Sequence, residues 1–211
     1  MSDEIMVIQA KEKKERALGE KLFLKAHRCN SPKCAMLRRP NRPGVHTKSR
    51  RKTSDYGNQL NAKQKFKIVY GVNERQMISI FKESARREGS TGEKIVETLE
   101  RRLDNAIFRS GLADSRIMAR HFIVRGHFLV NGKKTVSPSY LIRTGDIIAV
   151  RPESKSDLPF REIPEIQKKF TPPSWLELDA QKLEAKVVAL PLGIEPAFNI
   201  GAVVEYFAKN N

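Results

Sequence analysis

The sequence predicts an α+β fold: a helical subdomain with an inserted module of helices on a small, mainly antiparallel sheet, preceded by a basic, extended N-terminal segment. Three observations predict it. Apolar residues recur at helical spacing between residues 59 and 107. Two short β-prone runs flank Asn131-Gly132, the strongest short hairpin signal, because both residues tolerate a positive φ. Residues 27–52 show neither period.

Positive charge is concentrated near the N-terminus. The 211 residues include 40 Lys or Arg and 24 Asp or Glu, a net charge of +16. Residues 11–67 hold 18 of the basic and 4 of the acidic residues, which gives a net charge of +14. This balance is typical of a chain that neutralises a polyanion, although a basic protein that is merely soluble is the alternative. This segment has no long amphipathic apolar face, so binding to an anionic membrane surface is not favoured.

Targeting signals are missing from the sequence as given. No apolar run is long enough to predict a transmembrane helix. The start, MSDEIMVIQ, is acidic, and its apolar run is too short for a signal-peptide core. We therefore expect a cytosolic protein in which Cys29 and Cys34 stay reduced.

The N-terminal part combines a short helix with an irregular basic segment. Residues 11–25 alternate charges around a few apolar positions and predict the helix. Residues 27–52 contain three prolines and many cations but few large apolar side chains, so this segment cannot bury enough surface to fold freely. We expect it to be extended and ordered by RNA.

The two cysteines have two readings. Cys29 and Cys34 resemble half of a structural zinc site, for which His27 and His46 are the nearest further candidates at unconvincing spacings. Alternatively, the cysteines and Pro32 only shape a tight loop.

Three helices are predicted ahead of the sheet, over residues 54–69, 73–87 and 91–107. Ser54 or Asp55 can cap the first helix and Asn73 can cap the second, because their side-chain oxygens can accept the first unpaired backbone N–H groups. These helices form the helical subdomain.

A fourth helix opens the most informative stretch. It follows the N-cap candidates Asp114 and Ser115 and ends at Gly126. Arg116 and Arg120 lie one turn apart, so we expect both cations to face outward. The apolar side is expected to consist of Ile117, Met118, Phe122, Ile123 and Val124.

A hairpin with its tip at Asn131-Gly132 follows this helix, and Lys133 and Lys134 come just past the tip. A second turn is predicted at residues 144–146. The predicted strands are residues 128–130, 140–142 and 147–150.

The C-terminal part returns to the helical subdomain. Residues 151–173 are polar and Pro-rich and predict a linker. Residues 175–179 predict a strand or extended anchor, with Trp175 buried rather than stacked on a base, and 183–190 predict another strand. Residues 200–208 predict a terminal helix that docks on the helical subdomain. The predicted domains are 1–52 (basic extension), 53–98 (helical subdomain, completed by 174–211), 99–165 (module) and 166–211 (linker and C-terminal return).

Cations gather at one helix and the adjacent hairpin of the module. Such a neighbourhood has the charge and the shape with which proteins hold structured RNA, by backbone contacts and surface fit. The alternative is a generic module with solvated cations. The residues in question are Arg116, Arg120, Arg125, His127, Lys133 and Lys134.

Five motifs of this stretch carry a family resemblance. They resemble the RNA-binding module named after small-subunit ribosomal protein S four. The module also occurs in pseudouridine synthases, some aminoacyl-tRNA synthetases and a heat-shock RNA-binding protein, so alone it implies RNA and no single function. The motifs are RLDNAIFRSG (102–111), SRxxAR (115–120), RGHFLVNGK (125–133), PSY (138–140) and TGDIIAV (144–150).

The resemblance extends over almost the whole chain. Residues 21–44, 54–76, 91–105 and 173–184 are similar to the bacterial S-four family of small-subunit ribosomal proteins, and the run SDYGxQLxxKQK from residue 54 is specific to it. The chain lacks the basic opening that is usual in that family.

The family also bears on the metal. Its zinc-binding members carry a further cysteine pair about where Glu12 and Glu15 stand here. We therefore expect the zinc site to be lost and no cofactor to be present.

The resemblance implies a structural constituent of the small ribosomal subunit. It implies binding to a helical junction in the five-prime domain of 16S ribosomal RNA, nucleation of assembly, and a contribution to decoding accuracy where messenger RNA enters. Implied protein partners are S five, S twelve and S three, with no membrane and no small-molecule substrate. Some family members also repress translation of their own operon.

Two further groups of residues are expected to contact RNA alongside the six in the module. The basic segment contributes Arg28, Lys33, Arg38, Arg39, Arg42, Lys48, Arg50, Arg51 and Lys52. The first helix of the subdomain contributes Tyr56, Gln59, Lys63, Gln64, Lys65 and Lys67.

Two other classes compete with this reading. A pseudouridine synthase needs a catalytic aspartate in a second, larger domain, but only 61 residues follow Val150, and Asp179 is their only candidate in a plausible setting. We therefore expect no enzyme. A free RNA chaperone is usually a shorter chain around the module, and the long helical half speaks against it.

Overall fold

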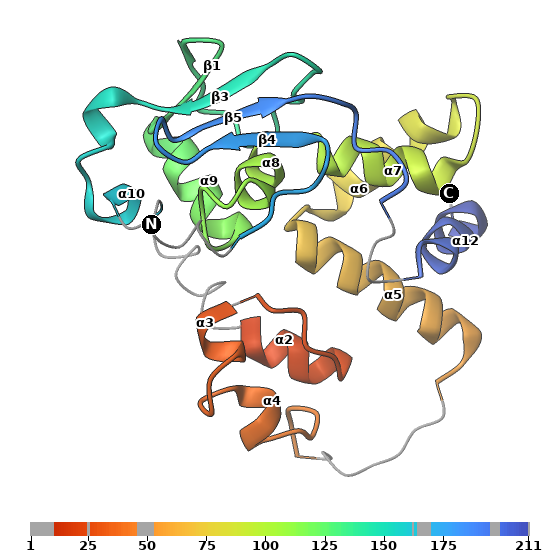
Figure 1. The fold of residues 1–211 in the computed structure, drawn as a ribbon. Coiled ribbons are helices and arrows are strands. Elements are labelled where there is room, and N and C mark those ends of the chain that lie inside the picture. Colours follow the sequence, from red (N-terminus) through yellow and green to blue (C-terminus); the bar gives the residue numbers. More distant parts are fainter. Residues whose placement is uncertain are drawn as a thin grey trace. The chain divides into compact units, whose positions relative to one another are not determined.

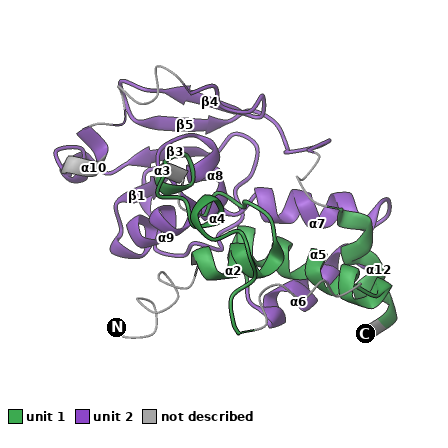
Figure 2. Cartoon of the chain, turned by 90° about the horizontal axis from the view of Figure 1, so that it is seen from below, with its two compact units in different colours: residues 1–72, 198–211 green, residues 73–197 purple. Residues whose placement is uncertain are grey.

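The structure is a computed structural model that describes residues 11–24, 26–45, 53–161, 163, 170–194 and 199–210. The chain divides into two compact units, residues 1–72 with 198–211 and residues 73–197 (Figure 2). The domain limits expected from the sequence stay a prediction.

The first unit contains short N-terminal helices and one long helix that packs on the terminal helix. Ser54 accepts a hydrogen bond from the Gly57 N–H at 3.3 Å, which starts the long helix where the sequence predicts. Gly71 ends it in the left-handed conformation, with φ of 59°. The helices are α2 (Lys11–Leu18), α3 (Ala26–Cys29), α4 (Ala35–Arg38), α5 (Asp55–Tyr70) and α12 (Ile200–Asn210).

Helices α5 and α12 pack against each other, with the ring centroids of Tyr56 and Tyr206 5.8 Å apart. Phe66 and Tyr70 on α5 are buried, with ring centroids 5.0 Å apart, and Val203 and Phe207 are buried on α12. Burial of each large apolar side chain contributes about 1.5–3 kcal/mol. The terminal helix therefore docks on α5, the first helix of the predicted helical subdomain, as expected.

The second unit places helices on one face of a sheet (Figure 1). Asn73 and Gln76 form a reciprocal capping box at the start of α6, with hydrogen bonds of 2.8 and 3.0 Å. The predicted second helix therefore starts at the expected cap. The helices are α6 (Glu74–Ala85), α7 (Thr91–Glu100), α8 (Leu103–Arg109), α9 (Arg116–Arg125), the 3₁₀ turn η1 (Pro152–Ser154) and α10 (Leu158–Arg161).

All neighbouring strands of the five-stranded sheet are antiparallel, in the order β2-β1-β3-β5-β4. Alternate residues of β1, β3 and β5 are buried, as expected when one sheet face is covered. The α+β class is thus confirmed. The strands are β1 (Phe128–Val130), β2 (Lys133–Lys134), β3 (Ile147–Val150), β4 (Leu176–Asp179) and β5 (Glu184–Val187).

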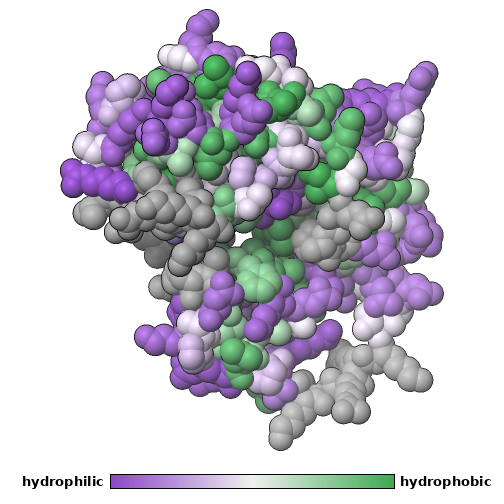
Figure 3. Space-filling model, in the orientation of Figure 1, coloured by the Kyte–Doolittle hydropathy of each residue, from purple (hydrophilic) through white to green (hydrophobic). Residues whose placement is uncertain are grey.

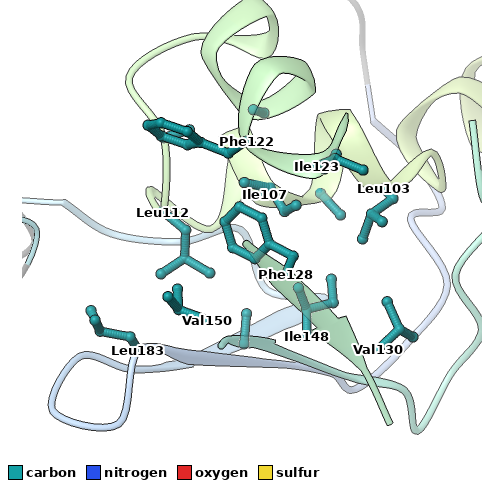
Figure 4. Packing of buried hydrophobic residues seen from close by; sticks show 14 of the residues in the cluster. Leu103, Ile107, Leu112, Phe122, Ile123, Phe128, Val130, Ile148, Val150 and Leu183 are labelled. Carbon is teal, nitrogen blue, oxygen red and sulfur yellow. The ribbon is translucent and has the colours of Figure 1, made fainter. Parts of the chain in front are cut away.

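The hydrophobic core lies between α8, α9 and the sheet (Figure 4). Phe128 and Ile148 from the strands and Ile107 and Ile123 from the helices are fully buried there. Trp175 is also buried at 3% exposure, which agrees with the packing role expected for it. This core fixes α9 and the β1–β2 hairpin on one rigid support.

One predicted strand is wrong. Residues 140–142 form no ladder, and only a single bridge joins Leu141 to Arg102. The backbone there serves the start of α8: the Leu103 N–H donates to the Tyr140 carbonyl at 2.8 Å. The Ile142 N–H likewise donates to the Arg101 carbonyl at 2.9 Å. Apolar, β-prone residues thus cap a helix start instead of pairing in the sheet.

Among the described residues, no helix is both long enough and apolar enough to cross a membrane.

Candidate nucleic-acid interface

Helix α9 forms between the two signals that predicted it. The Ser115 side chain accepts a hydrogen bond from the Met118 N–H at 3.2 Å, and Gly126 ends the helix with φ of 79°. The buried face consists of Ala119, Phe122 and Ile123.

The expected apolar side of α9 is partly wrong. Met118 is 37% exposed and Val124 is 63% exposed. Val124 lies five residues after the buried Ala119, so the helical rotation of about 100° per residue turns it well away from the core. The spacing of the buried residues, rather than the mere presence of apolar ones, selects the packed face.

The two arginines of α9 do not simply face outward as expected. Arg120 Nε donates to Asp104 Oδ2 at 2.6 Å, and Arg116 Nε donates to Asn105 Oδ1 at 2.7 Å. Asp104 is only 1% exposed and also receives two hydrogen bonds from Arg102, at 3.0 and 3.2 Å. A buried carboxylate needs such partners. Both α9 arginines nevertheless keep part of their surface in solvent.

A second buried carboxylate supports this arrangement. Glu100 is fully buried and receives hydrogen bonds from Asn105 Nδ2 at 2.7 Å and from both Arg109 Nε and Nη2 at 3.0 Å. Asn105 therefore links Glu100 to Arg116. This polar cluster sets the orientation of α9, and with it the position of the basic side chains that follow.

The hairpin tip has the geometry that the Asn-Gly pair predicts. Asn131 has φ of 51° and Gly132 has φ of 76°. Asn131 Nδ2 donates to Asp146 Oδ1 at 2.8 Å, and its Oδ1 accepts from the Ile147 N–H at 2.9 Å. The tip is thus fastened to β3, and both Lys133 and Lys134 are exposed on β2.

The hairpin touches the end of α9 through Lys134. A Cβ atom on Gly126 would lie 2.2 Å from Lys134 Cε, so the lysine stem lies directly over the glycine backbone. Arg125, the last residue of α9, is exposed beside it. Arg125, Lys133 and Lys134 therefore form one exposed basic group.

His127 is held by packing. Its Nδ1 lies 2.8 Å from Ser154 Oγ, and its ring contacts those of Phe122 and Phe160 at centroid distances of 5.8 and 5.6 Å. The imidazole is therefore part of the support for the hairpin, and its contact with RNA stays a prediction.

Arg143 is a further exposed cation in this unit that no sequence pattern marked. Its side chain is exposed, and its backbone N–H donates at 2.7 Å to Asp146 Oδ2, the carboxylate that also holds Asn131. A lone arginine in a turn carries no sequence signal of this position.

The residues predicted on α5 fall into two sets. Gln59 and Lys63 are buried and face α12: Gln59 Nε2 donates to Glu205 Oε2 at 2.8 Å, and Lys63 Nζ lies 4.1 Å from the centre of the Tyr206 ring. Their burial argues against the predicted RNA contact, because both polar ends are used between the helices. Tyr56 is 54% exposed.

The other predicted residues of α5 keep some exposure. Lys65 forms an ion pair with Glu20, and Gln64 and Lys67 are half-buried. A hydrogen bond with Tyr206 raises the pKa of the Tyr56 hydroxyl above its ordinary value of 10.0.

The basic segment is more ordered than expected as far as residue 45. It contains α3 and α4, and both Cys29 and Cys34 are buried thiols. Within the segment expected to be extended, residues 27–29 and 35–38 are therefore helical instead. Lys48, Arg50, Arg51 and Lys52 lie outside the described residues.

Glu15 explains much of this order. Its carboxylate is 2% exposed, and its Oε1 accepts hydrogen bonds from the Leu22 and Leu24 N–H groups, both at 3.1 Å. Phe23 between them has φ of 52°, an uncommon value outside glycine. The two carboxylate oxygens also lie 4.0 and 3.9 Å from Cys29 Sγ. A charged side chain thus organises the turn that the sequence left unexplained.

Several of the cations that the sequence predicts to contact RNA lie in this N-terminal segment. Lys33, Arg38, Arg39 and Arg42 are exposed, whereas Arg28 pairs with Glu12 at 3.0 Å. Hydrophilic side chains predominate on α2–α4, at the bottom of Figure 3.

Metal ligation finds little support here. Within the described ranges, no three His, Cys, Asp or Glu side chains are grouped to hold a metal ion. The His27 side chain and the whole of His46 lie outside those ranges.

A helix and a basic hairpin on a small antiparallel sheet, joined in one chain to a cationic helical unit, define an RNA-binding protein. Comparison with known families gives the same class. Residues 101–148 match the family model for the S4 domain, and residues 7–100 match that for the ribosomal protein S4/S9 N-terminal domain.

Sequence identity to individual proteins shows to which family of RNA-binding proteins the chain belongs. The small ribosomal subunit protein uS4 of Halothermothrix orenii is 44% identical over 196 residues, 92% of this chain and 94% of its own length. That of Pelotomaculum thermopropionicum is 48% identical over 176 residues, 83% and 85% of the two chains. Protein uS4A of Alkaliphilus oremlandii is 47% identical over 198 residues, 92% and 94%. The chain belongs to the uS4 family of small ribosomal subunit proteins.

Proposed function

We propose that this protein is a structural constituent of the small ribosomal subunit that binds a helical junction in the five-prime domain of 16S ribosomal RNA and nucleates assembly there. The observation that carries this proposal is that exposed cations lie on folded elements in both units. The basic group of Arg125, Lys133 and Lys134 is fixed by the hairpin and the α9 terminus. A second set surrounds α4 in the first unit.

The mechanism divides affinity from selectivity. Lys and Arg displace counterions from RNA phosphates, so affinity falls steeply with salt concentration. Selectivity comes from surface fit, because side chains cannot read base edges in the deep, narrow major groove of an RNA helix. Asn131 and Asp104 contribute indirectly, since they fix the hairpin and α9 in one shape.

The proposed RNA contacts are the exposed or half-exposed members of the predicted set, with Arg143 added. Gln59 and Lys63 are left out because they are buried. The proposed contacts are Arg28, Lys33, Arg38, Arg39, Arg42, Tyr56, Gln64, Lys65, Lys67, Arg116, Arg120, Arg125, His127, Lys133, Lys134 and Arg143.

Membership of the same family supports a proposal for the cellular setting. The protein acts bound to ribosomes in the cytoplasm, beside the neighbouring proteins S five, S twelve and S three and near the point where messenger RNA enters. It has no enzymatic activity, because its work is to hold RNA in place. Repression of its own messenger would use the same surface if that messenger folds into a similar junction.

Binding measured across a salt series tests the proposal. The purified chain is titrated with the five-prime domain of small-subunit ribosomal RNA and with an unrelated folded RNA of equal length. We expect a preference of about 3 kcal/mol or more for the cognate RNA, while both affinities fall with salt. Equal affinities with parallel slopes would show that charge acts without selection, and the assembly role would have to be withdrawn.

A further inference from the structure

The first unit contains an open pocket of about 720 Å³. It is lined by helices α2, α3 and α4 and by the loop that follows α4. Six of the residues around it are cations and only Glu12 is acidic. The cations come from several elements, so they approach the pocket from different sides. They are Lys13, Arg16, Arg28, Lys33, Arg38 and Arg39.

These cations differ in whether a carboxylate forms an ion pair with them. Glu12 balances Arg28 through the ion pair at 3.0 Å. Lys33, Arg38 and Arg39 are exposed, and no carboxylate within the described part of the chain forms an ion pair with them. Like charges at close quarters destabilise a free protein, and a bound polyanion removes that cost.

The Arg16 side chain donates hydrogen bonds to backbone carbonyls of the loop after α4. Its Nε donates to the carbonyls of Arg39 and Asn41 at 2.8 and 3.1 Å, and its Nη2 donates to the Asn41 carbonyl at 2.9 Å. The guanidinium of α2 therefore fixes the loop that carries Arg39. No sequence pattern marked Arg16 or Lys13 for a role.

The lining chemistry indicates the ligand. Apart from charged side chains the pocket is lined by Ala35, Pro43 and Gly44, so no aromatic ring is present on which a base could stack. Its volume lies in the range of sites for small ligands, well above the roughly 30 Å³ of one water molecule. Several phosphate groups would fit, and bases would point away.

We propose that this pocket is a phosphate-binding site that holds consecutive backbone phosphates of a sharply turned RNA strand. Lys13, Lys33, Arg38 and Arg39 bind the phosphates, and Arg16 is a positioning residue. The phosphates of a regular duplex follow two evenly wound strands, whereas a sharp turn of one strand brings consecutive phosphates together toward cations that converge from several elements. The inference rests on the proposed RNA-binding function and names the group that this part of the chain recognises.

Variants of the full chain test it with the five-prime-domain RNA. Arg38→Gln should weaken binding about 5- to 20-fold at physiological salt and lower the slope of log affinity against log salt by about 1. Lys82→Gln, which removes an exposed cation from α6, should change affinity by no more than about twofold. Equal losses for Arg38→Gln and Lys82→Gln would overturn the pocket.

Arg16→Lys separates positioning from charge. Lysine keeps the positive charge but cannot reproduce the planar fork that holds two carbonyls. We expect Arg16→Lys to lose as much affinity as Arg16→Gln. Full rescue by lysine would show that Arg16 acts only as a charge. Circular dichroism and thermal melting establish that each variant is folded.

Inorganic pyrophosphate gives a second arm that needs no ribosomal RNA. In the free wild-type chain it should shift the backbone amide NMR signals of residues 38–44, and Arg38→Gln should abolish the shift. Unmoved signals, with preference for the cognate RNA intact, would refute the pocket and leave the proposed function standing. Shifted signals without any preference among RNAs would do the reverse.

Discussion

Arg120 Nε and Asp104 Oδ2 lie 2.6 Å apart, and this contact joins the helix that carries the basic hairpin to the buried start of α8. Asp104 is 1% exposed and its carboxylate receives three arginine hydrogen bonds, two from Arg102 and one from Arg120. An arginine that sequence analysis places on the RNA surface is therefore also a structural link. Its position couples the stability of the module to the shape of its binding surface.

Loss of the Asp104 carboxylate should destabilise the module strongly. Asp104→Ala leaves the buried Arg102 without its partner, and breaking a buried pair typically costs about 3–5 kcal/mol. Urea unfolding of the wild-type and variant chains measures the loss. Asp114→Ala, which removes an exposed carboxylate ahead of α9, should cost less than about 0.5 kcal/mol. Equal midpoints for the two variants would contradict the structural role of Asp104.

Asn131 should stabilise the hairpin through both its backbone and its side chain. Asn131→Gly tolerates the φ of 51° but loses the bonds to Asp146 and Ile147, so we expect a cost of about 1–2 kcal/mol. Asn131→Ala should cost more, because alanine disfavours the left-handed region. Amide exchange of Ile147 reports the bond directly and should accelerate in both variants. Unchanged exchange would show that the side-chain bond adds nothing.

Local signals in the sequence located most elements of the fold. Ser54, Asn73 and Ser115 each accept the backbone hydrogen bond expected of an N-cap, and Gly71 and Gly126 end their helices in the left-handed conformation. Such features depend on a few adjacent residues and can be read without tertiary information.

Several features that the sequence did not indicate depend on tertiary contacts outside the regular helix and strand patterns. Leu141 is β-prone, but its segment meets the start of α8 and forms only one bridge. Lys63 looks like a surface cation until the Tyr206 ring is placed beside it, 143 positions later in the chain. The order of the N-terminal segment depends on Glu15, whose partners Leu22 and Leu24 form an irregular turn. No periodicity encodes such pairings.

Glu15 should be required for order in the N-terminal helices. Glu15→Ala leaves the Leu22 and Leu24 N–H groups without their acceptor, and hydrogen bonds to a charged group contribute about 1.5–3 kcal/mol each. Proteolysis near residue 23 should therefore become faster. Glu15→Gln keeps one acceptor oxygen and should lie between the wild type and Glu15→Ala. Restoration of the Glu15→Ala variant by added zinc would point to a metal site instead of a carboxylate.

Asp179 should show a measurable acid dependence. Hydrogen bonds from the Lys182 and Gln181 N–H groups, both at 3.0 Å, hold the pKa of its carboxyl below the ordinary 3.8. The folded pKa is lower than the unfolded one, so the stabilisation is complete above about pH 4 and is lost as the pH falls through the folded value. Carboxyl ¹³C NMR should give this low pKa, and Asp179→Ala should flatten the acid limb of the stability curve. Glu177→Ala on the same strand removes an exposed carboxylate as a control; an equal flattening there would argue against the turn.

Gly126 and Lys134 should act as one unit in RNA binding. In Gly126→Ala, the new methyl group meets Lys134 Cε at 2.2 Å, so the lysine must leave its place beside Arg125. Gly145→Ala introduces a residue at a comparable positive φ, 92° against 79°, where nothing lies within 4 Å of the new Cβ. Both should lose about 1–2 kcal/mol of stability from backbone strain, but only Gly126→Ala should also weaken RNA binding.

A double-mutant cycle with Lys134→Gln isolates the contact. If the lysine binds RNA from its position over Gly126, Lys134→Gln should weaken binding in the wild type and have little further effect in Gly126→Ala. Affinities measured at one salt concentration give the coupling free energy. Strictly additive losses would mean that Lys134 reaches the RNA equally well from elsewhere, and the fixed geometry of the basic group would then contribute nothing to recognition.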